Sequence, residues 1–264
     1  MSTGQKAALP AEEAVMKGLI IKDLYCLKKQ FVMFAFIITG VVAVAIMFVL
    51  SEQFGNLKET VTGMTEAGFD IASMVKISVM FFMLLPLVCT GNIADSFADD
   101  KAASFYKTAA SLPVPAEKRV LSKFVTAVLF LAVGLAVDVA MAAVISSVSD
   151  IILFSKCAGT LVSLSACMLI FMSCVILLNY AGVPSMYSTF IPLGIAGILI
   201  LALKMKDIVN ALTSDDVSSV TRTFRALINV LESRPHIFIL IAAATAVVCW
   251  FASVWFAKRK RGVA

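Results

Sequence analysis

The chain has 264 residues, of which 61% are hydrophobic and only 15% carry a charge. Soluble domains usually carry about 25% charged residues, so this composition excludes an ordinary soluble enzyme. The net charge of +5 is modest, and the basic residues gather near the ends of apolar runs. This distribution is typical of membrane orientation and not of nucleic-acid binding, so no nucleic-acid partner is expected.

Six apolar runs are long enough, or nearly long enough, to cross a bilayer as helices. A helix rises 1.5 Å per residue, so about 20 residues cover the roughly 30 Å hydrocarbon core. We therefore predict an all-α polytopic membrane protein with one transmembrane domain over residues 1–264. Its spans are predicted at about residues 31–50, 71–90, 124–146, 157–179, 187–203 and 236–257.

The segment before the first span divides into two parts. Residues 1–15 are small and polar and are expected to be flexible. Over residues 16–30, apolar side chains recur at helical spacing and lysines supply the polar side, which predicts an amphipathic interfacial helix. An equally simple interpretation is a cytosolic extension of the first span. Further along, a tight connector with Gly182 and Pro184 is expected between the fourth and fifth spans.

Orientation follows from lysine and arginine, which cytoplasmic loops carry in excess. Lysine and arginine gather in three segments: the one before the first span, residues 92–123 and residues 258–261. Six spans place these three segments on one side of the membrane. Both termini are therefore expected in the cytoplasm. Residues 204–235 carry five basic side chains on the opposite side, but four acidic ones balance most of that charge.

Metal and redox chemistry have little support in the sequence. None of the six cysteines forms a CxxC pair, and most lie in apolar runs, where cysteine behaves as a small hydrophobe. The lone histidine, His236, has no clustered partner. We expect no catalytic residue, metal site or cofactor in this chain.

The segment 98–123 reads ADDKAASFYKTAASLPVPAEKRVLSK and lies between the second and third predicted spans. Asp99 and Asp100 can cap a short helix that runs to about Ser111, and Pro113 and Pro115 end it. A short cytoplasmic helix between two spans can dock in a partner and pass a rigid-body push to both spans.

This segment carries a resemblance to a known family, the permease subunit of type-2 ABC exporters from Gram-positive bacteria. Residues 16–30 are similar to the usual start of that family, and residues 111–123 resemble its SLPVSRxxIVxSK signature. Departures occur at Phe105, Thr108, Ala116 and Arg119, where the family often has Trp, Tyr, Arg and an aliphatic residue. The matching positions are Ser111, Leu112, Pro113, Val114, Val120, Ser122 and Lys123.

The resemblance implies a bacterial plasma-membrane exporter. Such permeases pair with separately encoded ABC ATPase subunits, which bind ATP and Mg²⁺, and with a second permease copy, commonly as a homodimer in a 2+2 assembly. This chain has no GxxxxGK[ST] phosphate loop, in agreement with a separate ATPase. The resemblance also implies a coupling helix that docks on the ATPase; its aromatic and apolar residues would otherwise be interpreted as lipid anchors. The coupling residues are expected to be Phe105, Tyr106, Thr108, Ser111, Leu112 and Pro113.

The cargo is expected to be an amphipathic peptide or a hydrophobic antimicrobial compound, because intramembrane charges are scarce. Exporters of phenol-soluble modulins use permeases of this general kind, and bacteriocin self-protection is a close second. Before the last span, one helical face is apolar, which predicts either an interfacial helix on the outer leaflet or a lid over the exit. Its residues include Val220, Phe224, Leu227 and Leu231.

Two charges lie within predicted spans, Lys76 in the second and Asp138 in the third. Their similar depth suggests that they pair or that Asp138 faces a polar cavity; alternatively, Lys76 reaches the outer headgroups and Asp138 is partly protonated. Two other classes stay open. An ion-coupled secondary transporter would need more intramembrane ionisable groups, and a membrane-embedded enzyme would need clustered His, Asp or Glu.

Overall fold

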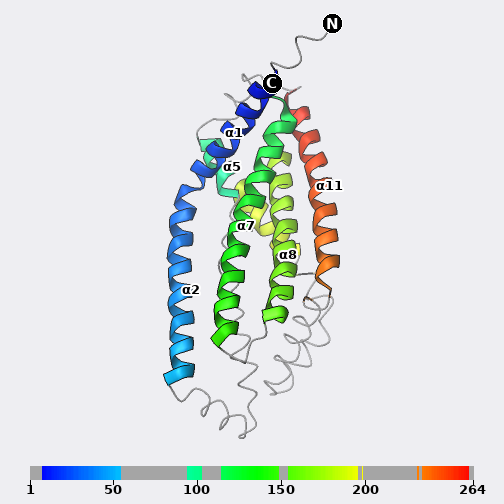
Figure 1. Cartoon of the computed structure of the whole chain (residues 1–264). Coiled ribbons are helices and arrows are strands. Elements are labelled where there is room, and N and C mark those ends of the chain that lie inside the picture. The colour runs from blue at the N-terminus through cyan, green and yellow to red at the C-terminus, as the bar shows by residue number, and fades with distance from the viewer. Residues whose placement is uncertain are drawn as a thin grey trace.

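The computed structural model describes residues 8–54, 94–102, 114–148, 154–195, 198, 231 and 234–261. Within these ranges the chain is helical and contains no strand, so the all-α prediction is confirmed for this part. Residues 185–195 form a helix after a short connector. The other helices are α1 (Ala8–Cys26), α2 (Lys28–Phe54), α5 (Ala94–Ala102), α7 (Ala116–Val148), α8 (Phe154–Ala181) and α11 (Pro235–Arg261), as Figure 1 shows.

Three helices in the described ranges are long and apolar enough to cross a membrane: Ala116–Ser147, Cys157–Ala181 and Pro235–Arg259. They contain the predicted ranges 124–146, 157–179 and 236–257. Helix α2 spans the predicted range 31–50 and includes a shorter apolar stretch, Ala35–Val44. The predicted range 71–90 lies outside the described residues, and 187–203 lies within them only in part.

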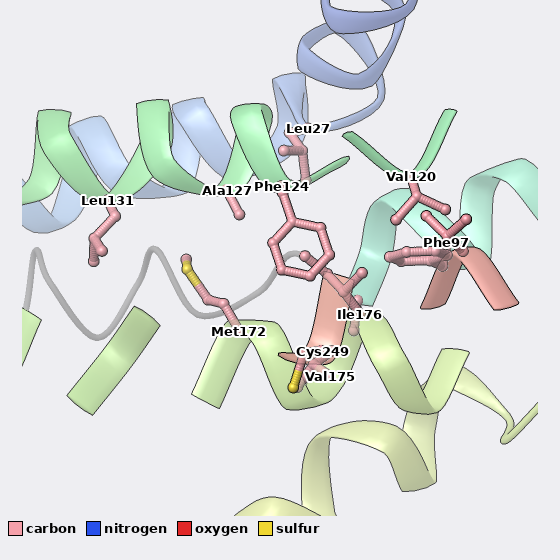
Figure 2. Close-up of a cluster of buried hydrophobic side chains, with 12 residues drawn as sticks. Leu27, Phe97, Val120, Phe124, Ala127, Leu131, Met172, Val175, Ile176 and Cys249 are labelled. Carbon is pink, nitrogen blue, oxygen red and sulfur yellow. The ribbon is translucent and has the colours of Figure 1, made fainter. Parts of the chain in front are cut away.

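Helices α7, α8 and α11 pack along one another, and α2 lies against α7 (Figure 1). Figure 2 shows Phe124 of α7 extending toward α8, where Met172 and Ile176 face it. A second apolar cluster joins α7 to the start of α8, with Ala142 and Cys157 at its centre. The outer surface of the bundle also carries large apolar side chains, as a surface in contact with lipid would. Examples are Phe36, Met47, Leu240, Val248 and Phe251.

Helix α1 differs from the predicted range 16–30 at both ends. It begins at Ala8, inside the segment expected to be flexible, and it ends at Cys26. The chain turns at Leu27, whose side chain is completely buried in the core while its N–H still bonds the Asp23 carbonyl oxygen at 3.2 Å. Helix α1 therefore ends before the predicted residue 30, and it inclines away from the axis of α2 (Figure 1).

The connector after α8 has the expected Gly182 and Pro184. Gly182 has a φ of 104°, and its N–H bonds the Asn179 carbonyl oxygen at 3.1 Å while the Val183 N–H bonds that of Leu178 at 3.0 Å. These two bonds form a Schellman motif, which ends a helix at a left-handed residue and favours glycine there. The chain then turns directly into the helix at residues 185–195.

Candidate functional site: a buried ring of four charges

Two lysines and two aspartates from three helices meet at the end of the bundle where α1, α5 and α7 converge. Lys22 Nζ lies 3.0 Å from Asp23 Oδ1 and 2.6 Å from Asp100 Oδ1. Lys123 Nζ lies 2.8 Å from Asp23 Oδ1 and 2.8 Å from Asp100 Oδ2. Each lysine therefore contacts both aspartates, and the four side chains form a closed ring of alternating charge. We call Lys22, Asp23, Asp100 and Lys123 the charge ring.

The charge ring is almost entirely removed from solvent. The side chains of Asp23, Asp100 and Lys123 are 1%, 5% and 5% exposed, and only Lys22 reaches water, at 27%. An isolated charge in such a place costs several kcal/mol of desolvation, so the balance of two positive and two negative groups is what permits the burial. Burial alone would lower the pKa of Lys22, but Asp23 and Asp100 outweigh it and raise that pKa above 10.5.

Hydrogen bonds and an aromatic ring fix the orientation of the charged groups. Lys123 Nζ also donates to Ser96 Oγ at 3.1 Å and lies 4.7 Å from the centre of the Phe97 ring. Ser122 Oγ donates to the Arg119 carbonyl oxygen at 2.9 Å and also lies 3.4 Å from Asp23 Oδ2. The Phe97 ring meets Tyr180 of α8 edge to face at 5.5 Å. The charge ring is thereby attached to the apolar core of the bundle.

Helix α5 supplies one face to this site. Ser96, Phe97 and Asp100 are buried, whereas Asp95 and Asp99 are exposed, as expected for residues three and four apart on a helix. The prediction that Asp99 and Asp100 cap a helix is therefore wrong, because α5 begins at Ala94 and both residues lie inside it. An aspartate at this point of the sequence is compatible with either a helix cap or a buried ion pair. The tertiary contacts show which of the two it forms.

Helix α7 begins directly after Pro115, with Glu117 in its first turn. The Lys118 N–H bonds the Pro115 carbonyl oxygen at 3.2 Å. Glu117 also forms an exposed ion pair with Lys258 near the end of α11, at 2.6 Å. This contact places the C-terminal end of α11 beside the start of α7, at the same end of the bundle as the charge ring.

Most of the sequence-predicted site residues fall outside the described ranges. This holds for the coupling residues Phe105, Tyr106, Thr108, Ser111, Leu112 and Pro113, for Lys76, and for Val220, Phe224 and Leu227. Asp138 is described and is completely buried in α7. It lies 15 residues after Lys123, about 22 Å along the helix, so it belongs to a different depth from the charge ring. Leu231 is buried, and its carbonyl oxygen accepts a hydrogen bond from Ser163 of α8 at 2.5 Å.

The sequence analysis did not identify Asp23, Ser96 or Phe97 as site residues. The available signal was charge inside an otherwise apolar setting: Asp23 lies in the segment 16–30, whose other charged residues are all basic, and Lys123 begins a long apolar run. Unpaired, such charges are costly near a membrane, so they require partners. The sequence offered several candidate partners and no means of choosing among them.

In the described part of the chain, Cys26, Cys157, Cys167, Cys174 and Cys249 are free thiols. No three His, Cys, Asp or Glu side chains gather there as metal ligands would.

Residues 66–259 match the family model described as ABC-2 family transporter protein. No curated protein and no solved structure matches the chain. The matched region covers more than half of the chain and includes α5, α7, α8 and most of α11, with Asp100 and Lys123 but not Lys22 or Asp23. The chain therefore belongs to the ABC-2 transporter family, as a multi-pass membrane permease that works with an ABC ATPase and is not itself an enzyme.

Proposed function

We propose that this chain is the permease of a bacterial ATP-driven exporter in the plasma membrane, moving amphipathic peptides or hydrophobic antimicrobial compounds outward. ATP and Mg²⁺ bind to a separate ATPase subunit, and a second permease copy completes a 2+2 assembly. Six spans place both termini in the cytoplasm. The ABC-2 family match supports the transport role, and the basic segments support the orientation.

One arrangement supports the proposal: the described residues on either side of the segment 103–113 lead into α5 and α7, and each of these helices holds a member of the charge ring. Helix α5 stops at Ala102, and the chain is described again from Val114, which is buried, one residue before Pro115. The described ends of α1 and α11 lie at this same end of the bundle (Figure 1). A motor subunit that engages residues 103–113 would therefore push on α5 and α7 directly, which is the role of a coupling helix.

The side chains that fill the bundle support the proposed cargo class. The buried side chains of α7, α8 and α11 are apolar or carry small hydroxyls, apart from Asp138, the ring member Lys123 and Asn179. Such an interior suits a cargo with a long apolar face better than a sugar or an ion. The segment before the last span is proposed as a lid or outer interfacial helix; its residue Leu231 is held against α8 through Ser163.

An ion-coupled transporter is the competing function, and the burial of Asp138 is the observation that favours it. Membership in the ABC-2 family argues against it. The two differ in their energy source. Transport by the proposed exporter requires ATP hydrolysis and persists when a protonophore abolishes the proton gradient.

The test begins with copurification of the chain with its candidate ATPase, followed by reconstitution in nanodiscs and proteoliposomes. The probes are a dansyl-labelled amphipathic helical peptide of leucine and lysine and, as a second cargo class, a lipophilic cationic dye. Phe105→Ala and Leu112→Asp should abolish probe-stimulated ATP hydrolysis and transport while the permease still inserts. Lys101→Ala, an exposed change on α5, is the matched control and should behave as wild type. Normal transport by both docking variants would exclude the role proposed for residues 103–113.

A further inference from the structure

We propose that the charge ring is a clamp that makes α1, α5 and the first turns of α7 move as one rigid unit during transport. The inference rests on the proposed function and specifies how motion received at residues 103–113 reaches the first span. The push would pass through Asp100 and Lys123 to α1, and from α1 through Leu27 to α2. Helix α1 is then a driven part of the transporter and not a passive membrane anchor.

The geometry of the charge ring resists the separation of any one helix. Moving α5 away would break both contacts of Asp100, and moving α7 away would break both contacts of Lys123. Moving α1 away would break the Lys22–Asp100 and Lys123–Asp23 pairs together. In each case a buried charge loses its partners, which is far more costly than the separation of a solvent-exposed pair.

Charge pairing fixes the relative position of the three helices more specifically than apolar packing does. Apolar contacts are non-directional, and beside a membrane an apolar helix face has lipid as an alternative neighbour. Ion pairs with added hydrogen bonds require one relative position of the groups, here fixed further by Ser96, Ser122 and Phe97. Buried ion pairs are seldom more stabilising than apolar substitutes, so their value here is a single defined position.

The same geometry divides the segment 111–123 into two functional parts. Ser122 and Lys123 are only 2% and 4% exposed, and their polar atoms are directed to α1 and α5. A docked ATPase cannot touch them. The end of this segment therefore acts inside the permease, and contact with the motor subunit is left to the residues before Ser122.

The clamp reaches the first span because the junction between α1 and α2 is itself buried. Leu27 is the one residue between these helices, and it packs with Phe97, Val120 and Phe124 in the core cluster (Figure 2). A rotation of α1 must carry Leu27, and Leu27 leads directly into Lys28 at the start of α2. One connecting residue leaves little slack between the two helices.

The experiment measures the distance between α1 and α5 by double electron–electron resonance. Spin labels are placed at Lys17→Cys and Asp99→Cys, both exposed, in a chain whose native cysteines are replaced by alanine. The distribution should be narrow and unchanged between the permease alone, its ATPase complex and the complex trapped with ATP and vanadate. A shift of the wild-type distance between these states would overturn the clamp.

Lys123→Met should widen the distribution, and transport of the dansyl peptide per ATP hydrolysed should fall by roughly tenfold or more, because two buried aspartates are left with Lys22 as their one partner in the ring and an excess negative charge remains. Copurified ATPase should not decrease. Lys123→Arg, which keeps the charge, should restore a narrow distribution, and Lys101→Met is the exposed lysine control. A narrow distribution or an unchanged transport ratio in Lys123→Met would refute the proposal.

If Lys123→Met does not accumulate, the double variant Lys123→Met with Asp100→Asn removes one charge of each sign and leaves Lys22 paired with Asp23. It should accumulate and show the same widened distribution. The labels report on the permease alone, so the clamp is decided even where no ATPase binds. Failure of the wild-type chain to bind an ATPase would count against the proposed function and not against the clamp.

Discussion

Lys123 of α7 and Asp23 of α1 form a 2.8 Å ion pair across 100 positions of the chain. Both groups are buried, and each has a second partner of opposite charge in the charge ring. A change at one position is therefore felt by three helices.

Asp100→Asn should lower the free energy of unfolding by about 3 kcal/mol, because it removes one partner from a buried ion-pair network and leaves an excess positive charge. The side chain keeps its shape, so packing is not the cause. Titration with SDS in mixed micelles measures this free energy. Asp99→Asn, the same change on the exposed face of α5, is the control and should stay within about 0.5 kcal/mol of wild type. Equal effects of the two variants would contradict the burial argument.

Gly182→Ala should destabilise the chain by about 1–2 kcal/mol, because Gly182 has a φ of 104° and a side chain is strained in that region. Gly194→Ala is the matched control: Gly194 is helical, and an added Cβ would meet nothing within 4 Å. It should be neutral or slightly stabilising. Comparison of the melting temperatures of the two purified variants tests this; a stable Gly182→Ala would exclude strain at the connector.

Asn179 and Ser188 should be coupled energetically across the connector. Asn179 Nδ2 donates to Ser188 Oγ at 2.7 Å, and both residues are buried. Hydrogen bonds between membrane helices contribute about 0.6 kcal/mol on average and up to about 1.7. A double-mutant cycle with Asn179→Ala and Ser188→Ala should give a coupling energy in this range. A value of zero would mean that the bond adds no stability.

Stability at acid pH should depend on Glu117. Hydrogen bonding to Lys258 and its charge lower the pKa of Glu117 from 4.5. A depressed folded pKa means that the stabilisation is present above pH 4.5 and is lost as the pH falls through the lower folded value. Glu117→Gln should therefore flatten the decline in melting temperature below pH 4.5, with little change at neutral pH because the pair is exposed.

The contribution of Lys22 to stability should depend on pH in the opposite direction to that of Glu117. Its pKa is raised above 10.5, so its contribution is complete below that pH and is lost only as the pH rises through the folded value. Melting temperatures of Lys22→Met and wild type should therefore differ by a constant amount between about pH 6 and 9. A difference that varies within this window would indicate that another group titrates in the charge ring.

Lys76 and Asp138 are predicted to pair within the outer half of the membrane, or Asp138 faces a polar cavity. If they pair, Lys76→Met combined with Asp138→Asn should be less destabilising than the sum of the single changes, because the double variant leaves no lone charge. The SDS-titration cycle measures the difference. Additive effects would exclude the pair, and unchanged folding and transport in Asp138→Leu would exclude a role for the charge.

The helices could be predicted from the sequence because their signal is local. Uninterrupted apolar runs predicted the ranges that α2, α7, α8 and α11 contain, and Gly182 marked the connector at the end of α8. The end of α1 could not be predicted, since Leu27 continues the helical pattern of apolar residues and its burial in the core depends on tertiary contacts. Within the spans, periodicity does not distinguish lipid-facing from buried positions, because both are apolar.

The charge ring could not be predicted because its contacts are distant in the chain. Lys22 and Asp100 are 78 positions apart, and Asp23 and Lys123 are 100 apart. Asp99 and Asp100 are identical in type and adjacent, yet one is exposed and the other is a ring member. The choice between them depends on the rotation of α5 about its axis, which its nine residues alone do not determine.

The separation of the ring members also sets an order of events during synthesis. At about 5–20 residues per second, Lys123 leaves the ribosome roughly 5–20 seconds after Asp23. Until then Lys22 and Asp23 have none of their later partners on α7. Docking of α1 is therefore a late step of biogenesis, completed only after the start of α7 has emerged.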